Sequence, residues 1–259
     1  MRILQRGIVA LFLLTLLAFG GLKYYLYTSI DRIPPVITCD SDVVEVRVGV
    51  GEEALLAGVT ARDNADGDVT GSVMIKGVSQ LITADTAKVT YIAFDSSNNM
   101  ATASRTVRYT NYEKPRFVLT QPMVFLVGSQ VRLLDRLTAS DVIDGDISEN
   151  IGVTTQNVNA YTPGVYNVTV QVTNSLGDVE SLPLKVTVAS GSQYLLDVRL
   201  SEYITYLKVG DRFDPAAYIL TPDPQAVEVA SDVDTGLPGV YEVSYTYQTD
   251  TVYQTVVVR

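Results

Sequence analysis

The chain repeats itself at a spacing of 78 residues, and this repeat limits the possible folds more than any other feature. The segment DNADGDVT at 63–70 reappears as DVIDGDIS at 141–148. A fixed period of this kind predicts successive copies of one structural unit. A third segment, VDTGLPGVY at 233–241, parallels AYTPGVY at 160–166 and predicts a third copy, which lacks the Asp-Gly-Asp turn.

Each copy has the pattern of short β-strands. In YNVTVQV at 166–172 and YEVSYTY at 241–247, large apolar side chains alternate with smaller or polar ones, which is typical of half-buried antiparallel strands. About seven such strands per copy pack most economically as two antiparallel sheets face to face. We therefore expect an all-β fold with three sandwich modules, at 34–109, 114–188 and 193–259.

An uncharged segment precedes the repeats. Residues 7–22 contain no ionisable side chain, and Lys23 can extend its amine toward the membrane surface. Interfacial tyrosines then follow, so that the apolar span reaches about 21 residues, or about 30 Å of helix. This pattern predicts a transmembrane signal anchor at 7–27, after a cytoplasmic tail at 1–6 and before a linker at 28–33. The interfacial tyrosines are Tyr24, Tyr25 and Tyr27.

The orientation follows from the charges that flank this segment. Arg2 and Arg6 precede it, so the positive-inside rule places the N-terminus in the cytoplasm and the modules outside the cell membrane. The alternative is a cleaved signal peptide, because Ala18-Phe19-Gly20 has the small-x-small pattern of a cleavage site. Cleavage after Gly20 would release a secreted chain that begins at Gly21.

The composition excludes several classes of function. The chain has no His, no Trp and a single Cys, which removes Ser-His-Asp chemistry, His-ligated metals and multi-Cys zinc sites. Three of the 19 basic side chains precede residue 31, so the remainder has 16 basic and 29 acidic groups, a net charge of −13. Such an acidic body repels nucleic acid. We expect neither nucleic-acid binding nor enzymatic activity.

The Asp-x-x-Asp-Gly-Asp turns are the candidate metal sites, because Ca²⁺ takes six to eight hard oxygen ligands. Asp95 and Asn98 are further candidate ligands in the first module. The alternative is purely structural, since Asp side chains stabilise turns by accepting hydrogen bonds from nearby backbone amides. The six turn aspartates are Asp63, Asp66, Asp68, Asp141, Asp144 and Asp146.

Cys39 is unpaired within the chain, so two interpretations of it stay open. Outside the cell it could form an intermolecular disulfide and a dimer. The interpretation that we favour is a small buried side chain on the first strand. The third module is rich in tyrosine, and we expect most of these side chains in the core, with any exposed ones available to a protein or glycan partner. They are Tyr203, Tyr206, Tyr241, Tyr245, Tyr247 and Tyr253.

The order of motifs over 34–99 resembles bacterial Ig-like modules first noted in a pesticidal crystal protein. The similarity rests on PPVI, LAGVTARDNADGDVT and VTYIAFDSSNN, and the second module is similar. The third, with LKVGDRFDP at 207–215, looks like a related bacterial Ig-like group. This resemblance implies three tandem Ig-like sandwiches in a surface protein of the Gram-positive type, where such modules act as spacers or adhesive units.

These observations predict a non-catalytic, membrane-anchored stalk or adhesion protein of the bacterial cell surface. Its expected partners are the lipid bilayer, through the helix, and an extracellular protein or glycan. A second hypothesis is a calcium-dependent binding module that uses the aspartate turns. A third is a secreted enzyme or inhibitor released by cleavage near Gly20.

Overall fold

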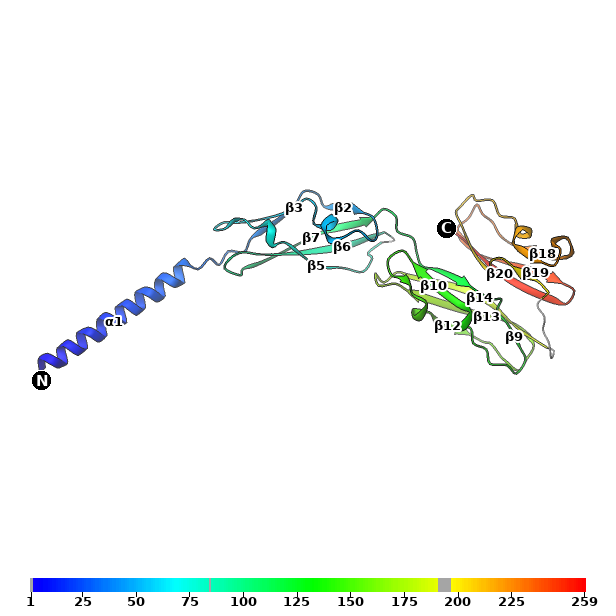
Figure 1. The fold of residues 1–259 in the computed structure, drawn as a ribbon, viewed down its shortest axis with the longest axis horizontal. Coiled ribbons are helices and arrows are strands. Elements are labelled where there is room, and N and C mark those ends of the chain that lie inside the picture. The colour runs from blue at the N-terminus through cyan, green and yellow to red at the C-terminus, as the bar shows by residue number, and fades with distance from the viewer. Residues whose placement is uncertain (1, 84, 191–196) are drawn as a thin grey trace. The chain divides into compact units, whose positions relative to one another are not determined.

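The computed structural model describes residues 2–83, 85–190 and 197–259 (Figure 1). The chain divides into two compact units, 1–110 and 111–259. The described residues form one long N-terminal helix and several small β-sheets. The all-β expectation with a preceding helix is therefore confirmed.

The N-terminal helix α1 covers Arg2–Ser29. Its stretch Gln5–Tyr27 is long and apolar enough to cross a membrane, and all of its side chains are exposed. The apolar run begins after Arg6 and extends into the tyrosines around residue 25, as the sequence predicts. Whether this helix is retained or cleaved stays a prediction.

The first unit contains two sheets after α1. The smaller sheet has the order β1-β3-β4 and the larger has the order β2-β7-β6-β5. A short helix α2 (Glu52–Leu56) and a 3-10 turn (Thr70–Ser72) connect them. The strands are β1 (Val36–Cys39), β2 (Val43–Val46), β3 (Val59–Asp63), β4 (Gly67–Asp68), β5 (Met74–Val78), β6 (Thr86–Phe94) and β7 (Met100–Tyr109).

The second unit contains two further pairs of sheets. The first pair has the orders β11-β10-β8 and β12-β13-β14-β9, and the second has β15-β17 and β16-β20-β19-β18. The first pair is formed by β8 (Arg116–Leu119), β9 (Val124–Leu126), β10 (Leu137–Asp141), β11 (Gly145–Asp146), β12 (Gly152–Gln156), β13 (Gly164–Thr173) and β14 (Val179–Ala189). The second is formed by β15 (Arg199–Leu200), β16 (Ile204–Leu207), β17 (Ile219–Thr221), β18 (Glu228–Ser231), β19 (Gly239–Tyr247) and β20 (Asp250–Val258).

The sequence repeat is also a structural repeat. Strands β3, β4 and β5 recur 78 residues later as β10, β11 and β12 with the same lengths. The predicted inward face of β13 is confirmed, since Val168, Val170 and Val172 are buried. On β19 the same alternation buries Val243 and Tyr245. Hydrophobic periodicity thus identified the core face of these strands.

One ladder in each pair of sheets is parallel. β2 pairs with β7, β9 with β14 and β16 with β20 in this way, whereas the other ladders are antiparallel. In the first unit, residues 40–42 connect β1 in the smaller sheet to β2 in the larger one. β2 runs alongside β7, the last strand of its unit, in the same direction.

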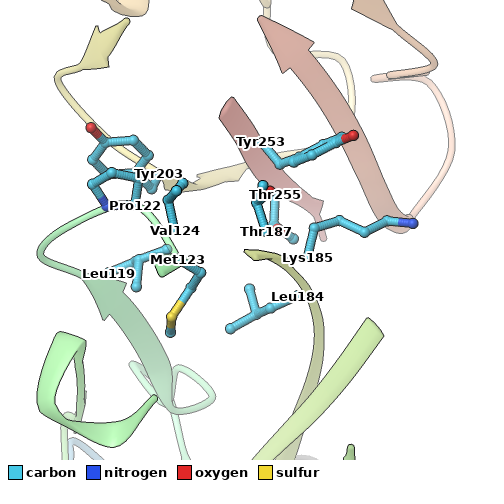
Figure 2. Close-up of a pocket in the computed structure, with 10 residues that line it drawn as sticks. All are labelled: Leu119, Pro122, Met123, Val124, Leu184, Lys185, Thr187, Tyr203, Tyr253 and Thr255. Carbon is cyan, nitrogen blue, oxygen red and sulfur yellow. The ribbon is translucent and has the colours of Figure 1, made fainter. Parts of the chain in front are cut away.

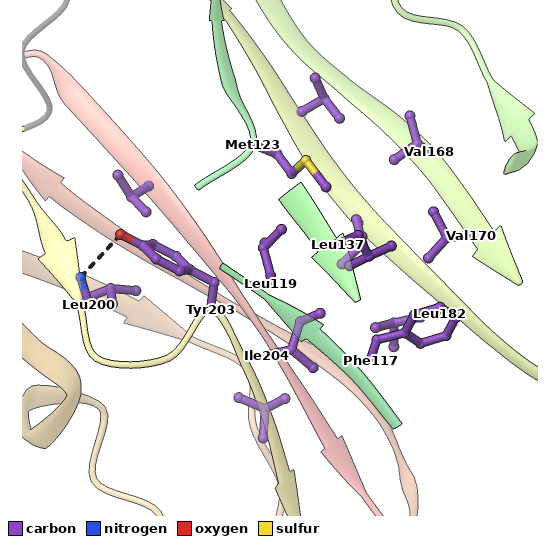
Figure 3. Close-up of a cluster of buried hydrophobic side chains, with 14 of the residues drawn as sticks. Phe117, Leu119, Met123, Leu137, Val168, Val170, Leu182, Leu200, Tyr203 and Ile204 are labelled. Atoms are coloured by element: carbon purple, nitrogen blue, oxygen red, sulfur yellow. Dashed lines mark hydrogen bonds between the residues drawn. The ribbon is translucent and has the colours of Figure 1, made fainter. Parts of the chain in front are cut away.

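The core of the second unit is continuous. Phe117, Leu182, Tyr203 and Ile204 belong to one cluster of buried side chains, although they come from both pairs of sheets (Figure 3). In the first unit, the buried side chains gather around Val107 and around Tyr91. Three separately folded modules, with the boundaries given above, stay a prediction.

Candidate functional site

Three carboxylates converge at one end of the first unit. Asp31 lies between α1 and β1, Asp63 is the last residue of β3, and Asp95 directly follows β6. One carboxylate oxygen from each residue lies within 4.8 Å of the other two. Asp63 and Asp95 are buried, with 5% and 7% of their surface exposed. Three segments far apart in the sequence therefore bring negative charges together.

The turn after β6 holds Asp95 in place. The backbone amide of Asn99 donates to Asp95 Oδ1 at 2.7 Å, and Asn99 Nδ2 donates to Asp95 Oδ2 at 2.7 Å. Asn99 Nδ2 also donates to the carbonyl oxygen of Asp31 at 3.1 Å. Asn98 has a φ of 63° at this turn. One asparagine side chain thus links the turn to the segment that enters the unit.

Two oxygens of this carboxylate group have no hydrogen-bond donor. Asp63 Oδ1 accepts from the backbone amides of Ala65 at 2.8 Å and Asp66 at 3.0 Å. These bonds lower the pKa of Asp63 below its ordinary value, the bond from Asp66 being the larger cause. Asp63 Oδ2 and Asp31 Oδ2 are buried without a partner. Buried polar atoms in proteins normally have a hydrogen-bond partner, so these two oxygens are exceptions.

The other two aspartates of the turn bond elsewhere. Asp66 Oδ2 accepts from the backbone amide of Ser96 at 2.7 Å, and Asp66 Oδ1 accepts from the Ser96 hydroxyl at 2.8 Å. Asp68 Oδ1 accepts from the backbone amide of Thr70 at 2.9 Å. Asp66 therefore fastens one turn to the next, and Asp68 stabilises its own turn. Neither Asp66 nor Asp68 belongs to the carboxylate group, which is formed by Asp31, Asp63 and Asp95.

The repeat in the second unit has the same framework with different chemistry. Asp141 Oδ1 accepts from the backbone amides of Ile143 and Asp144, as Asp63 does in the first unit. Its Oδ2, however, accepts from Asn174 Nδ2 at 2.8 Å. Asn174 directly follows β13, just as Asp95 directly follows β6. An amide donor thus stands where the first unit has a third carboxylate.

Tyr112 completes this second network. Asn174 Nδ2 donates to the Tyr112 hydroxyl oxygen at 3.1 Å, and that hydroxyl donates to Asp178 Oδ2 at 2.5 Å. The backbone amide of Asp178 donates to Asn174 Oδ1 at 2.9 Å. The two carboxylates here, Asp141 and Asp178, are therefore connected through neutral side chains.

The remaining predicted residues of the second unit repeat the pattern of Asp66 and Asp68. Asp144 accepts from the backbone amide and the hydroxyl of Ser175, at 2.6 and 2.7 Å. Asp146 Oδ1 accepts from the Ser148 hydroxyl at 2.6 Å and its amide at 3.0 Å, and these bonds lower the pKa of Asp146. The sequence patterns did not predict Asp31 as a site residue, because it lies outside the repeated segments. The one feature that could have indicated it is an acidic side chain just before the first strand.

Cys39 and the tyrosines of the last sheets take ordinary structural positions. Cys39 ends β1, is half-buried and is free of a disulfide. Each of the six tyrosines named for the third module is buried or half-buried. In the same unit, Tyr161 is 80% exposed. An exposed tyrosine surface in the third module is therefore not formed by the six predicted residues.

A small cavity lies among side chains of the second unit (Figure 2). Its volume of about 10 Å³ is enough for roughly one water molecule. Its walls include Leu119, Met123 and Leu184 on one side and Tyr203 and Tyr253 on the other. This cavity is too small to hold an organic substrate.

Comparisons with known proteins show one similarity in sequence. No family model matches the chain. The pesticidal crystal protein Cry22Aa of Bacillus thuringiensis is 29% identical over 198 residues. The match covers 71% of this chain and 27% of the crystal protein, so the chain spans about a quarter of that relative's length.

Solved structures give weaker likenesses. A structure of the CBM51-2 domain in complex with GlcNAc and the INT domains of Clostridium perfringens ZmpB is 18% identical. The match covers 57% of this chain and 26% of the chain in that structure, with a TM-score of 0.25. The protocadherin gammaB7 EC3-6 structure is 12% identical and covers 86% of this chain and 73% of that one, with a TM-score of 0.21.

Proposed function

We propose that the chain is a non-catalytic surface protein, held in the cell membrane by α1, whose β-sandwich modules lie outside the cell and contact a protein or glycan. The observation that carries the membrane anchoring is that every side chain of the apolar stretch Gln5–Tyr27 is exposed. Leu14, Leu17 and Phe19, for example, are 65%, 72% and 60% exposed. An apolar surface of this length requires a cover, and the hydrocarbon core of a bilayer supplies one of the same thickness.

The modules themselves support a binding role over catalysis. The chain has no His, and the paired aspartates of the repeated turns act as acceptors for backbone amides and hydroxyls. The core of the second unit is filled by Val, Leu and Tyr side chains. The Ig-like assignment of the modules belongs to this proposal and is supported by the similarity to the crystal protein.

Cysteine labelling in intact cells tests the orientation. In a Cys39→Ser background, Ser97→Cys and Thr249→Cys each place one thiol at an exposed turn. A membrane-impermeant maleimide should label both without cell lysis. A cysteine inserted after Met1 serves as the inside control and should react only after lysis. Labelling of the inserted cysteine in intact cells, or protection of the other two, would contradict the proposed topology.

Charged substitutions in the middle of α1 test whether this helix anchors the protein in the membrane. Leu13→Arg with Leu14→Arg places two cations in the middle of α1, each costing about 2.5–3.5 kcal/mol in a bilayer. This variant should leave the membrane fraction, whereas Leu13→Ala with Leu14→Ala should stay there. A wild-type protein found in the medium with Gly21 as its first residue would favour the secreted alternative instead.

A further inference from the structure

We propose that Asp31, Asp63 and Asp95 bind one Ca²⁺ ion, which fastens the segment after α1 to the first β-sandwich. The donor set is three carboxylates brought together from three separate segments. Ca²⁺ binding can be measured independently of the proposed membrane topology, because all three ligands lie within the first unit.

The first step of the argument is the pair of oxygens without donors. Asp63 Oδ2 and Asp31 Oδ2 are buried and accept no hydrogen bond, and Asp63 as a whole is 5% exposed. A buried carboxylate oxygen without a donor is costly unless a cation or a proton compensates it. Three carboxylates in contact range add mutual repulsion to that cost. A divalent cation removes both costs at once.

The second step is the match of the donors to the ion. Carboxylate oxygens are the ligands that Ca²⁺ prefers, at distances of about 2.4 Å. Two oxygens on opposite sides of one such ion are then about 4.8 Å apart, and the three carboxylate oxygens all lie within 4.8 Å of one another. Mg²⁺ holds its ligands at about 2.0–2.1 Å and requires a more compact set. Further coordination positions would be filled by water.

The third step is the comparison within the chain. In the second unit, Asn174 replaces the carboxylate of Asp95, and its amide donates to Asp141 Oδ2. The equivalent of Asp63 Oδ2 is therefore satisfied by the protein alone. In the second unit, this group of side chains thus satisfies its own hydrogen bonds without a metal ion. In the first unit, the equivalent group has a carboxylate oxygen for which the protein supplies no donor. This difference locates the metal site in the first unit.

The consequence of binding is local order at the entry of the first unit. Asp31 is held there by the Asn99 side chain, which donates to its carbonyl oxygen, and by the proposed ion. Without Ca²⁺, repulsion from Asp63 and Asp95 opposes this placement. Removal of the ion should therefore loosen residues 30–35 more than any strand of the sandwich.

The test uses the full chain in detergent, with about 2 mM Ca²⁺ or with EDTA. For a dissociation constant of about 10⁻⁴ M, Ca²⁺ should raise the melting temperature of the first unit by about 5 °C or more. Hydrogen exchange of residues 30–35 and 95–99 should slow on Ca²⁺ addition. Equal melting curves and equal exchange in both conditions would overturn the proposal. Mg²⁺ at the same concentration should have a smaller effect, and an equal effect would overturn the assignment to calcium.

The decisive variant is Asp95→Asn, which copies the chemistry of Asn174. It should abolish the Ca²⁺ effect while the first unit stays folded in EDTA, because it removes one of three repelling charges, although it also gives up the hydrogen bond that Asp95 Oδ2 accepts from Asn99 Nδ2. This result cannot be mistaken for misfolding. Asp68→Asn, close to the ligand Asp63 in the sequence but bonded to Thr70, is the matched control and should keep the Ca²⁺ shift. Loss of the shift in Asp68→Asn with retention in Asp95→Asn would contradict the proposed ligands.

Discussion

Arg105 donates from Nε to the hydroxyl oxygen of Tyr91 at 2.8 Å, and both side chains are buried inside the first unit. Arg105 Nη2 also donates to the carbonyl oxygens of Leu55 and Ala57, and Nη1 forms an ion pair with Asp40 at 3.2 Å. The guanidinium group therefore satisfies the carbonyls at the end of α2. Arg105 and Tyr91, whose hydroxyl donates to the Leu55 carbonyl oxygen at 2.6 Å, together hold this short helix against the larger sheet.

Replacement of this arginine should destabilise the first unit. Arg105→Met removes the side-chain donor of the Ala57 carbonyl oxygen and one of the two donors of the Leu55 carbonyl oxygen, which keeps its bond from the Tyr91 hydroxyl. We expect a cost of about 1–3 kcal/mol. Arg108→Met, on the same strand, is the control, because its ion pair with Glu45 is largely exposed and should contribute less than about 1 kcal/mol. Calorimetry of the full chain, with hydrogen exchange of β6 and β7, measures both. Equal effects of the two substitutions would contradict the role assigned to Arg105.

A buried polar network in the second unit gives another prediction. Gln254 is fully buried, its Oε1 accepts from the Tyr245 hydroxyl at 2.6 Å, and its Nε2 donates to Thr205 Oγ1 at 3.0 Å. Tyr245→Phe should cost about 1–3 kcal/mol, because Gln254 Oε1 loses its donor. The control is Tyr241→Phe on the same strand, whose hydroxyl bonds to Leu237 at an exposed position.

The coupling of these two residues separates the hydrogen bond from simple packing. Tyr245→Phe combined with Gln254→Leu should destabilise the unit by less than the sum of the single changes, since the buried acceptor is then absent. Denaturant unfolding of the four proteins gives the coupling energy. Strict additivity would mean that the Tyr245–Gln254 bond makes no net contribution.

The buried carboxyl group of Glu180 should make the stability of the second unit depend on pH. Burial raises the pKa of Glu180 above its ordinary value of 4.5, although Arg259, 3.4 Å away, opposes this shift. The folded state therefore binds the proton more tightly than the unfolded state, and this group's stabilising contribution is complete at pH below 4.5. That contribution is lost as the pH rises through the folded-state pKa.

Unfolding measured from pH 4 to pH 7 tests this sign. Glu180→Gln cannot ionise, so its stability relative to wild type should increase as the pH rises. Arg259→Met removes the cation that favours the ionised form and should make the wild-type decline steeper. A Glu180→Gln difference that is constant with pH would show that this carboxyl does not titrate differently on folding.

The sequence predicted the strands of the repeat well because local alternation records which side chains face the core. Val168, Val170 and Val172 could be placed on the inner face of a strand without knowledge of its neighbours. The parallel partner of β2 could not be predicted in this way, since alternation says nothing about which strand lies alongside. Pairing depends on the path of the whole chain.

In the candidate site, too, local sequence patterns do not predict which residues meet in the folded chain. Asp63 was identified from its turn, but its neighbours Asp66 and Asp68 bond to Ser96 and Thr70 instead of sharing its surroundings. Asp31 joins Asp63 through tertiary packing across more than thirty residues of sequence, and no local motif marks it. Spacing identifies a turn, whereas the fold decides which of its carboxylates meet.

The parallel ladders determine how the sandwiches respond to mechanical load. In the first unit, β2 lies near the entry of the chain and pairs with β7, the strand by which the chain leaves. A pull on the two ends of such a unit displaces these strands in opposite directions along their length. Their hydrogen bonds then share the force and break together in shear, not one after another as in a hairpin opened from its end. β9 with β14 and β16 with β20 have the same geometry, so each pair of sheets resists extension along the chain.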